Sequence, residues 1–376
     1  MKCLYIAEDY LTSSVHHHLA EALAVQGMDM TVFTVERRNK AMKDLRFGYG
    51  DIRYKSIVTP LEGSHPAYKY FFPYKIRTKY DMINREIDLS GINIIHAATL
   101  FSEGAVALEI YRKHAIPYIV AVRSSDLFFY LRKMPHLWNL GKKILREARR
   151  IIFITPNARQ MALQSPVLRD MKDYIQTNSV VIPNGMDPFW HTHINRKKPV
   201  KTPSSILYVG NFEDCKNVPV LIRSCELLRT DHPDLTLTLA GGGGNRQKEV
   251  KIMAEKHPEW ITMTGRVTDR EVLMEIYRRH DIFAMVSRET FGLVYLEALT
   301  QGLPLVYARN SGFDGIFDEG FVGYGAVLGN SRDLASNIRR VMEEYEVLAG
   351  NIGTLSFDAY RWENIAERYR EIYERS

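Results

Sequence analysis

The sequence predicts an α/β protein of two Rossmann-like domains, each built on a mostly parallel sheet. Three observations lead to this prediction. The 376 residues exceed the length that one ordinary core accommodates. Short apolar runs alternate with amphipathic stretches in both halves of the chain, which is the pattern of βαβ units. A polar stretch at 191–203 carries lysines and prolines, interrupts this alternation and predicts a domain boundary.

The first domain is expected at 1–190. Its opening βαβ unit consists of a strand at 3–7, a helix at 15–26 ending before Gly27, and a strand at 30–35. The same rhythm recurs further along, with strands at 92–96, 118–122 and 151–154 and a helix at 103–114. Helical connections between successive strands predict parallel pairing.

The second domain is expected at 204–355, after the linker region 191–203. Its strands are predicted at 205–209, 235–240, 261–264, 282–286, 305–307 and 325–328, with helices between them. The last segment, 356–376, places Tyr360, Ile365, Tyr369 and Ile372 at helical spacing. It therefore predicts a terminal amphipathic helix.

Composition narrows the function classes. The net charge of +6 favours anionic partners such as nucleotides or acidic lipid headgroups. Nucleic acid is disfavoured because no helix-turn-helix, RNP-like or zinc-finger pattern accompanies the basic residues. The three cysteines lack CxxC spacing, so we expect reduced thiols and no metal site. No apolar run of membrane-spanning length and no signal-peptide pattern occur, and we expect a cytoplasmic protein.

The richest segment for chemistry is 289–297, which joins a buried strand to a helix. Unpaired N–H groups at the helix start would stabilise a diphosphate placed over Phe291, Gly292 and Leu293. Glu289 precedes this point and Glu297 lies one turn inside the helix. Carboxylates accept hydrogen bonds from vicinal hydroxyls, so Glu289 suits a sugar and Glu297 a ribose.

Two further loops could contact phosphate. In the loop after the strand at 205–209, Lys216 could neutralise phosphate charge, although a solvated loop lysine is an equal alternative. The glycine run starting at Gly241 and Gly242 allows close backbone approach, or forms a bare turn. It does not match G-x-G-x-x-G, which disfavours a dinucleotide redox cofactor.

These motifs resemble the GT4 family of retaining glycosyltransferases, which have the GT-B fold with two parallel sheets facing an interdomain cleft. Segment 289–297 resembles the family's E-x7-E element and 302–306 its G-x-P-V-V strand entry. Segment 181–187 resembles the interdomain V-I-P-N-G-V-D, and 265–267 the loop near the nucleotide base. The resemblance covers essentially the whole second domain and is looser in the first.

Departures from the family pattern occur at four places. Asn211 follows Gly210 where the family usually has Arg, and the family's His near the end of the strand at 118–122 is replaced by a loop from Arg123 to Asp126. The segments 12–14 and 311–315 replace two glycine-containing loops. The R-x-x-D and x-G-x-D-G patterns are similar to those of a subgroup of bacterial polysaccharide glycosyltransferases.

The resemblance implies a metal-independent hexosyl transfer that needs no cofactor besides the nucleotide-sugar donor. The candidate donor-binding residues are Gly210, Asn211, Lys216, Gly241, Gly242, Arg266, Glu289, Phe291, Gly292, Leu293 and Glu297. The candidate catalytic group is Glu289, Lys216, Arg123 and Asp126, the last two positioning sugar or acceptor. The terminal helix, through Trp362, is expected to pack back on the first domain.

The acceptor side is predicted from charge. Segments 68–77 and 127–150 mix aromatics with cations, which suits an anionic membrane surface and a lipid-linked or polysaccharide acceptor, or else a solvated basic face. Two other functions stay open. Asn211 and Arg123 replace residues that are usual in the family, which suggests a catalytically silent subunit that binds a nucleotide sugar. The same fold would also suit a nucleotide-sugar epimerase.

Overall fold

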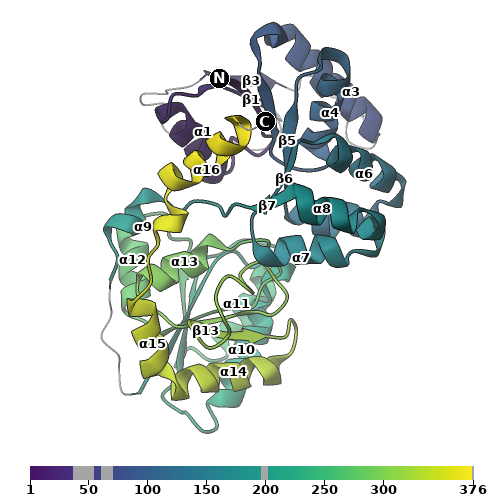
Figure 1. Cartoon of the computed structure of the whole chain (residues 1–376). Coiled ribbons are helices and arrows are strands. Elements are labelled where there is room, and N and C mark those ends of the chain that lie inside the picture. Colours follow the sequence, from purple (N-terminus) through teal and green to yellow (C-terminus); the bar gives the residue numbers. More distant parts are fainter. Residues whose placement is uncertain (37–54, 61–70, 196–201, 375–376) are drawn as a thin grey trace. The chain divides into compact units, whose positions relative to one another are not determined.

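The computed structural model describes residues 1–36, 55–60, 71–195 and 202–374. It divides into two compact units, Met1–Gly185 with Ala359–Ser376, and Met186–Asp358 (Figure 1). The second unit begins ahead of the predicted linker region 191–203, and 196–201 lie outside the described residues. Each unit is built on its own parallel sheet, as the alternation of strand and helix patterns predicts.

The sheet of the first unit has seven strands in the order β3-β2-β1-β4-β5-β6-β7, all paired in parallel. The strands are β1 (Lys2–Ile6), β2 (Asp29–Glu36), β3 (Lys55–Pro60), β4 (Ile94–Ala97), β5 (Tyr118–Val122), β6 (Arg150–Phe153) and β7 (Ser179–Val181). The helices are α1 (Ser14–Val25), α3 (Phe72–Glu86), α4 (Ser102–His114), α5 (Leu131–Lys133), α6 (Trp138–Glu147), α7 (Pro156–Gln164), α8 (Lys172–Asn178) and α16 (Trp362–Glu374). The order reverses between β1 and β4.

The sheet of the second unit repeats this topology with six strands, β10-β9-β8-β11-β12-β13. The strands are β8 (Ser205–Val209), β9 (Thr236–Ala240), β10 (Ile261–Gly265), β11 (Ile282–Met285), β12 (Leu305–Ala308) and β13 (Gly323–Ala326). The helices are α9 (Pro188–Thr192), α10 (Val218–Leu228), α11 (Gln247–Glu255), α12 (Arg270–Arg278), α13 (Leu293–Thr300), α14 (Ser331–Glu343) and α15 (Tyr345–Gly353). Here the order reverses between β8 and β11, and ligands of such sheets bind beyond the carboxyl ends of the strands at that point.

Alternation along the strands of the first unit creates two cores. Leu4 and Ile6 face one apolar cluster, whereas Cys3 and Tyr5 face the other, as the two-residue period of a strand requires. The second cluster is covered by α1 and by the C-terminal helix α16, which lie side by side in Figure 1.

The helix α16 is held to the first unit by tight contacts. Trp362 packs so closely on Gly185 that a Cβ there would lie 2.3 Å from the indole. At the other end, the Tyr373 hydroxyl forms a 2.7 Å hydrogen bond with Nδ1 of buried His96. The C-terminal helix is therefore an integral part of the core of this unit.

The structure differs from the predicted elements at three strands. β3 and β7 were not predicted, and the last strand is observed at Gly323–Ala326 and not at 325–328. Gly323 has φ 151°, and a Cβ there would meet the Leu305 carbonyl oxygen at 1.9 Å. The glycines of this strand let it approach β12 closely. They also interrupt the apolar alternation by which a strand is recognised in a sequence.

Candidate functional site

The junction between β11 and α13 lies at the point where the second sheet reverses its strand order. Gly292 precedes the helix with φ 84°, a left-handed conformation that favours glycine, and a Cβ there would lie 2.6 Å from the Tyr295 ring. The first N–H groups of α13 have no partner within the helix and carry its positive dipole end. Phe291, Gly292 and Leu293 thus lie at the start of α13, where the sequence predicts an anion site.

Two side chains that the sequence assigned to different parts of a ligand contact each other directly. Lys216, after β8, forms an ion pair with Glu289, after β11, across 73 residues of sequence. Their side chains are 20% and 18% exposed. The Ser287 hydroxyl donates a 2.8 Å hydrogen bond to the same carboxylate oxygen. Lys216 and Glu289 therefore form one charge-balanced unit at the strand-order reversal.

The loop 311–315 positions Glu289 through its backbone. The Glu289 N–H donates to Ser311 Oγ (2.9 Å), and the Gly312 N–H donates to the Glu289 carbonyl (2.8 Å). A Cβ on Gly312 would lie 2.3 Å from the Thr290 carbonyl carbon, so only glycine fits there. The sequence marked this loop as a departure from the family pattern, and the structure gives it a supporting role.

The glycines after β8 and β9 bring the two strand ends together. A Cβ on Gly241 would lie 1.8 Å from the Gly210 carbonyl oxygen. Asn211 is exposed, and its carbonyl accepts a 2.6 Å hydrogen bond from the Tyr208 hydroxyl. Asn217 donates from Nδ2 to the Val286 carbonyl (3.0 Å), which ties the loop carrying Lys216 to the end of β11.

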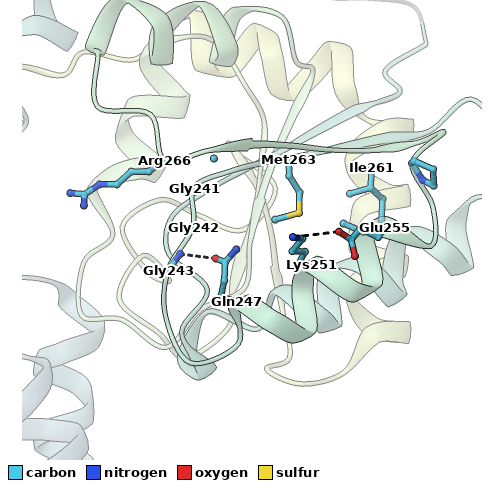
Figure 2. Close-up of a pocket in the computed structure, with 12 residues that line it drawn as sticks. Gly241, Gly242, Gly243, Gln247, Lys251, Glu255, Ile261, Met263 and Arg266 are labelled. Carbon is cyan, nitrogen blue, oxygen red and sulfur yellow. Dashed lines mark hydrogen bonds and ion pairs between the residues drawn. The ribbon is translucent and has the colours of Figure 1, made fainter.

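Beside these loops lies a cavity of about 720 Å³ between the glycine run, α11 and the edge strand β10 (Figure 2). Gly241, Gly242 and Arg266 line it, as does Gln247, whose Oε1 accepts a 2.7 Å hydrogen bond from the Gly243 N–H. Figure 2 shows the Arg266 guanidinium extending away from the Lys251–Glu255 ion pair on α11. The volume falls within the range of small-molecule sites.

Several residues of this cavity could not be predicted from sequence motifs. They are Gln247, Lys251, Glu255, Ile261 and Met263. The three from α11 lie at i, i+4 and i+8, so they share one helix face. This helical spacing of polar residues was the available sequence signal for a binding surface, but an ordinary solvent-exposed helix face has the same pattern.

Glu297 is partly buried inside α13. The Tyr277 hydroxyl donates a 3.0 Å hydrogen bond to its Oε2. Burial raises the pKa of Glu297 to about 7, and the hydrogen bond from Tyr277 only partly opposes this shift. A carboxyl group with a pKa in this range changes its hydrogen-bonding capacity near neutral pH.

In the first unit, the Asp126 side chain lies in the core, whereas the sequence predicts a role in positioning sugar or acceptor. It is fully buried and accepts hydrogen bonds from the N–H groups of Leu100 (3.0 Å), Phe101 (3.1 Å) and Arg123 (2.9 Å). Burial raises its pKa to about 7, while these N–H donors lower it. The Asp126 carboxylate therefore holds the loop after β4.

Arg123 is partly buried and bridges two loops. Its Nε donates to the Ala98 carbonyl (2.9 Å) and its Nη1 to Asn184 Oδ1 (3.2 Å). Arg123 and Asp126 lie in the same loop, and their observed contacts organise the strand ends of the first sheet.

A buried charge cluster lies where the first sheet reverses its strand order, and sequence reasoning missed it. Glu8, directly after β1, binds Lys79 (2.9 Å) and Lys75 (3.0 Å) through Oε2. Lys79 Nζ also lies 4.0 Å from Glu103 Oε1, and Lys75 Nζ donates to Ser102 Oγ (3.3 Å). The Lys75 and Glu8 side chains are 13% and 14% exposed, so the cluster is nearly closed to solvent.

Electrostatics within this cluster follow from burial and pairing. Burial opposes ionisation of Glu8, but Lys79 and Lys75 outweigh it and hold the pKa of Glu8 far below its ordinary value. Burial raises the pKa of Glu103. The available sequence signal was the i, i+4 spacing of Lys75 and Lys79 in one helix. Lys75 was instead assigned from the sequence to the basic aromatic segment 68–77.

Part of the basic face predicted at 127–150 is paired in the structure, where Lys142 and Arg146 bind Asp170. Within the segment 68–77, residues 68–70 lie outside the described residues, and Lys75 belongs to the charge cluster. For Lys142 and Arg146, this pairing favours the interpretation as a solvated basic face.

Comparisons with solved structures define the fold. The chain is similar over 100% of its length to all of Anabaena HepE crystallised with UDP, with a TM-score of 0.73 and 16% identity. It is likewise similar to 98% of sucrose-phosphate synthase from Thermosynechococcus elongatus, with a TM-score of 0.73 and 18% identity. The fold is therefore the two-domain α/β GT-B fold of glycosyltransferases.

Sequence comparisons give the family. The model "Glycosyltransferase Family 4" matches 13–189 and "Glycosyl transferases group 1" matches 191–351. An uncharacterized glycosyltransferase of Methanocaldococcus jannaschii is 24% identical, covering 90% of this chain and 93% of its own. Alpha-monoglucosyldiacylglycerol synthase of Acholeplasma laidlawii is 23% identical over 71% and 70%. The chain belongs to the GT4-type glycosyltransferases.

Two features are absent from the described residues. Across 1–36, 55–60, 71–195 and 202–374, no helix combines the length and apolarity that crossing a bilayer requires. Within the same residues, no three His, Cys, Asp or Glu side chains gather in a way that could hold a metal ion.

Proposed function

We propose that this glycosyltransferase transfers a hexose from a nucleotide sugar with retention of anomeric configuration and without a metal ion. The Lys216–Glu289 pair beside the start of α13 is the observation that carries the proposal. Lys216 would supply a cation for the diphosphate, and Glu289, which is in direct contact with Lys216, would supply a carboxylate for the sugar hydroxyls. The neighbouring cavity along α11 would hold the nucleoside. Glu297, which lies in α13 and does not line that cavity, would accept hydrogen bonds from the ribose hydroxyls.

Charge redistribution would be the main catalytic contribution. As the bond from the anomeric carbon to the diphosphate oxygen breaks, negative charge grows on the leaving group beside Lys216 and the helix start. The acceptor oxygen bonds to the anomeric carbon from the same face, and its proton passes to the departing diphosphate oxygen. Glu289 would meanwhile hold the sugar in orientation.

We place the acceptor on the first unit, at the strand-order reversal next to Glu8, Lys75 and Ser102. A glycan or lipid-linked glycan acceptor is favoured by the Acholeplasma relative, whose name describes a glycolipid synthase. The anionic membrane surface remains a proposed location for such an acceptor. UDP in the HepE complex supports a nucleotide-sugar donor for this chain.

The test is release of nucleoside diphosphate from a panel of uridine, guanosine, adenosine and thymidine nucleotide sugars, with and without glycan acceptors. One donor is expected to react, and the NMR coupling of the product's anomeric proton is expected to match the donor's configuration. Lys216→Ala is expected to lower kcat/KM by roughly 100-fold, as removal of an electrostatic stabiliser does elsewhere. The control is Lys172→Ala, an exposed lysine of α8.

Three outcomes would contradict the proposal. Binding of a donor without any turnover would favour a silent subunit, which the exposed Asn211 first suggested. Conversion of the donor to its epimer without an acceptor would favour an epimerase. Loss of turnover on EDTA treatment, with recovery after a divalent cation is added, would refute metal independence.

A further inference from the structure

A second cavity, of about 370 Å³, lies in the first unit between the strands β6 and β7 and the C-terminal helix α16. Its apolar lining consists of Val180, Ile182 and Ile372. Val180 of β7 and Ile182, which directly follows the strand, lie two residues apart and pack into the same apolar cluster as α16. None of the residues assigned to glycosyl transfer lines this cavity.

The polar lining is strongly basic. Arg149, Arg150, Arg368 and Glu371 line the cavity, so three guanidinium groups face one carboxylate. Arg368 donates a 2.5 Å hydrogen bond to the Val181 carbonyl, which orients its side chain and leaves further N–H donors. The charged residues that line the cavity thus sum to two positive charges, and the rest of the lining is apolar.

The pairing of Arg149 and Arg150 differs from that of several other arginines in this unit. Arg112, Arg146 and Arg77 each bind a carboxylate. Neither the Arg149 nor the Arg150 guanidinium forms an ion pair or hydrogen bond with another residue in the described part of the chain. Concentrating such charges around a cavity costs free energy through mutual repulsion unless an anion binds.

We propose that this cavity binds a phosphate group carrying a small organic substituent. Guanidinium groups bind phosphate oxygens in pairs, and a phosphate monoester matches the excess charge. The volume exceeds that of phosphate alone, which leaves room for a substituent against Val180, Ile182 and Ile372. A soluble phosphorylated metabolite and the headgroup of an anionic phospholipid share this chemistry.

The test uses glycerol 3-phosphate, with uncharged glycerol as its control. Bound glycerol 3-phosphate is expected to slow amide hydrogen exchange in β7 and α16 but not in 286–300, which reports separately on the proposed donor site. Arg149→Gln/Arg150→Gln is expected to raise the calorimetric Kd about ten-fold or more, because two charge-assisted contacts are lost. Glu371→Gln is expected to lower the Kd, because it removes the opposing charge.

The matched control is Arg169→Gln/Lys172→Gln, which removes the same charge from exposed residues of the same unit that do not line the cavity. Its Kd is expected to stay within about two-fold of the wild type, since distant exposed charges are screened by salt. Equal unfolding midpoints of the two double variants and the wild type confirm that each is folded.

Vesicles distinguish the two sources of phosphate. Co-sedimentation with phosphatidylglycerol but not phosphatidylcholine vesicles, lost in Arg149→Gln/Arg150→Gln alone, identifies a lipid headgroup. Protection by glycerol 3-phosphate without co-sedimentation identifies a soluble phosphate. Absence of both effects in the wild type, or an equal response of the two double variants, overturns the proposal.

Discussion

Protonation of Glu297 should control donor affinity near neutral pH. Its pKa of about 7 in the protein, raised by burial, means that roughly half of the molecules carry a neutral carboxyl group at that pH. Only the ionised form accepts hydrogen bonds from both ribose hydroxyls, whereas the protonated form is itself a donor at one oxygen. Donor binding should therefore weaken as the pH falls.

The size of the change in Kd follows from the fraction of Glu297 that is ionised at each pH. About one tenth of Glu297 is ionised at pH 6 and about nine tenths at pH 8, so the apparent Kd should be about ten-fold higher at pH 6. The ligand should be an intact nucleotide sugar, because a terminal phosphate has its own ionisation near pH 6. Calorimetric titration at pH 6, 7 and 8 measures the change.

Two variants isolate the effect. Glu297→Gln cannot ionise, so its Kd should be higher than that of the wild type at pH 8 and nearly constant with pH. Glu343→Gln, an exposed glutamate of α14, should keep the pH dependence of the wild type. An unchanged Kd between pH 6 and pH 8 in the wild type, or the same pH dependence in Glu297→Gln, would refute the reasoning.

Three further predictions concern stability. Glu8→Gln should lower the free energy of unfolding in urea by about 3 kcal/mol or more, because it leaves two buried lysines without their carboxylate. Since the pKa of Glu8 is lowered in the folded state, its contribution should be present above its ordinary pKa of 4.5 and be lost as the pH falls further. Gly241→Ala should lower the unfolding free energy by about 1–3 kcal/mol and weaken donor binding in calorimetry, since its Cβ would meet the Gly210 carbonyl oxygen. Gly185→Ala should loosen α16, seen as faster amide hydrogen exchange there, because its Cβ would overlap the Trp362 ring.

Each stability prediction has a control in the same chain. Glu109→Gln breaks only an exposed pair with Lys113 and should cost less than about 1 kcal/mol. Gly243→Ala adds a Cβ with nothing within 4 Å, so only its left-handed backbone is strained. Gly350→Ala likewise meets nothing and should leave α16 protected. Equal effects of a variant and its control would contradict the contact inferred from the structure.

The sequence predicted most of the fold because strand and helix periodicity is local. The strands around Leu4, Ile95 and Val120 were recognised from short apolar runs, and parallel pairing followed from the helices between them. The strand at Gly323–Ala326 was misplaced because glycines remove the apolar pattern. β3 and β7 passed unrecognised, the latter with only three residues.

The segment 289–297 was recognisable as a candidate binding loop, whereas its ion pair with Lys216 was not. The segment from Glu289 to Glu297 has a local motif, so its place at a helix start could be predicted. Its contact with Lys216 spans 73 residues and depends on strand order. Asp126 shows the converse: a polar residue in a loop suggests exposure, yet three backbone N–H groups satisfy it in the core.

The most direct measurement of the central claim is thermal unfolding with a panel of nucleoside diphosphates and nucleotide sugars. A ligand present at 100 times its Kd stabilises the native state by about 2.7 kcal/mol. One nucleotide sugar should raise the Tm of the wild type and of Lys172→Ala, and both Lys216→Ala and Glu289→Ala should lose this shift. No shift with any ligand, or a shift that persists in both site variants, would contradict a donor site at the start of α13.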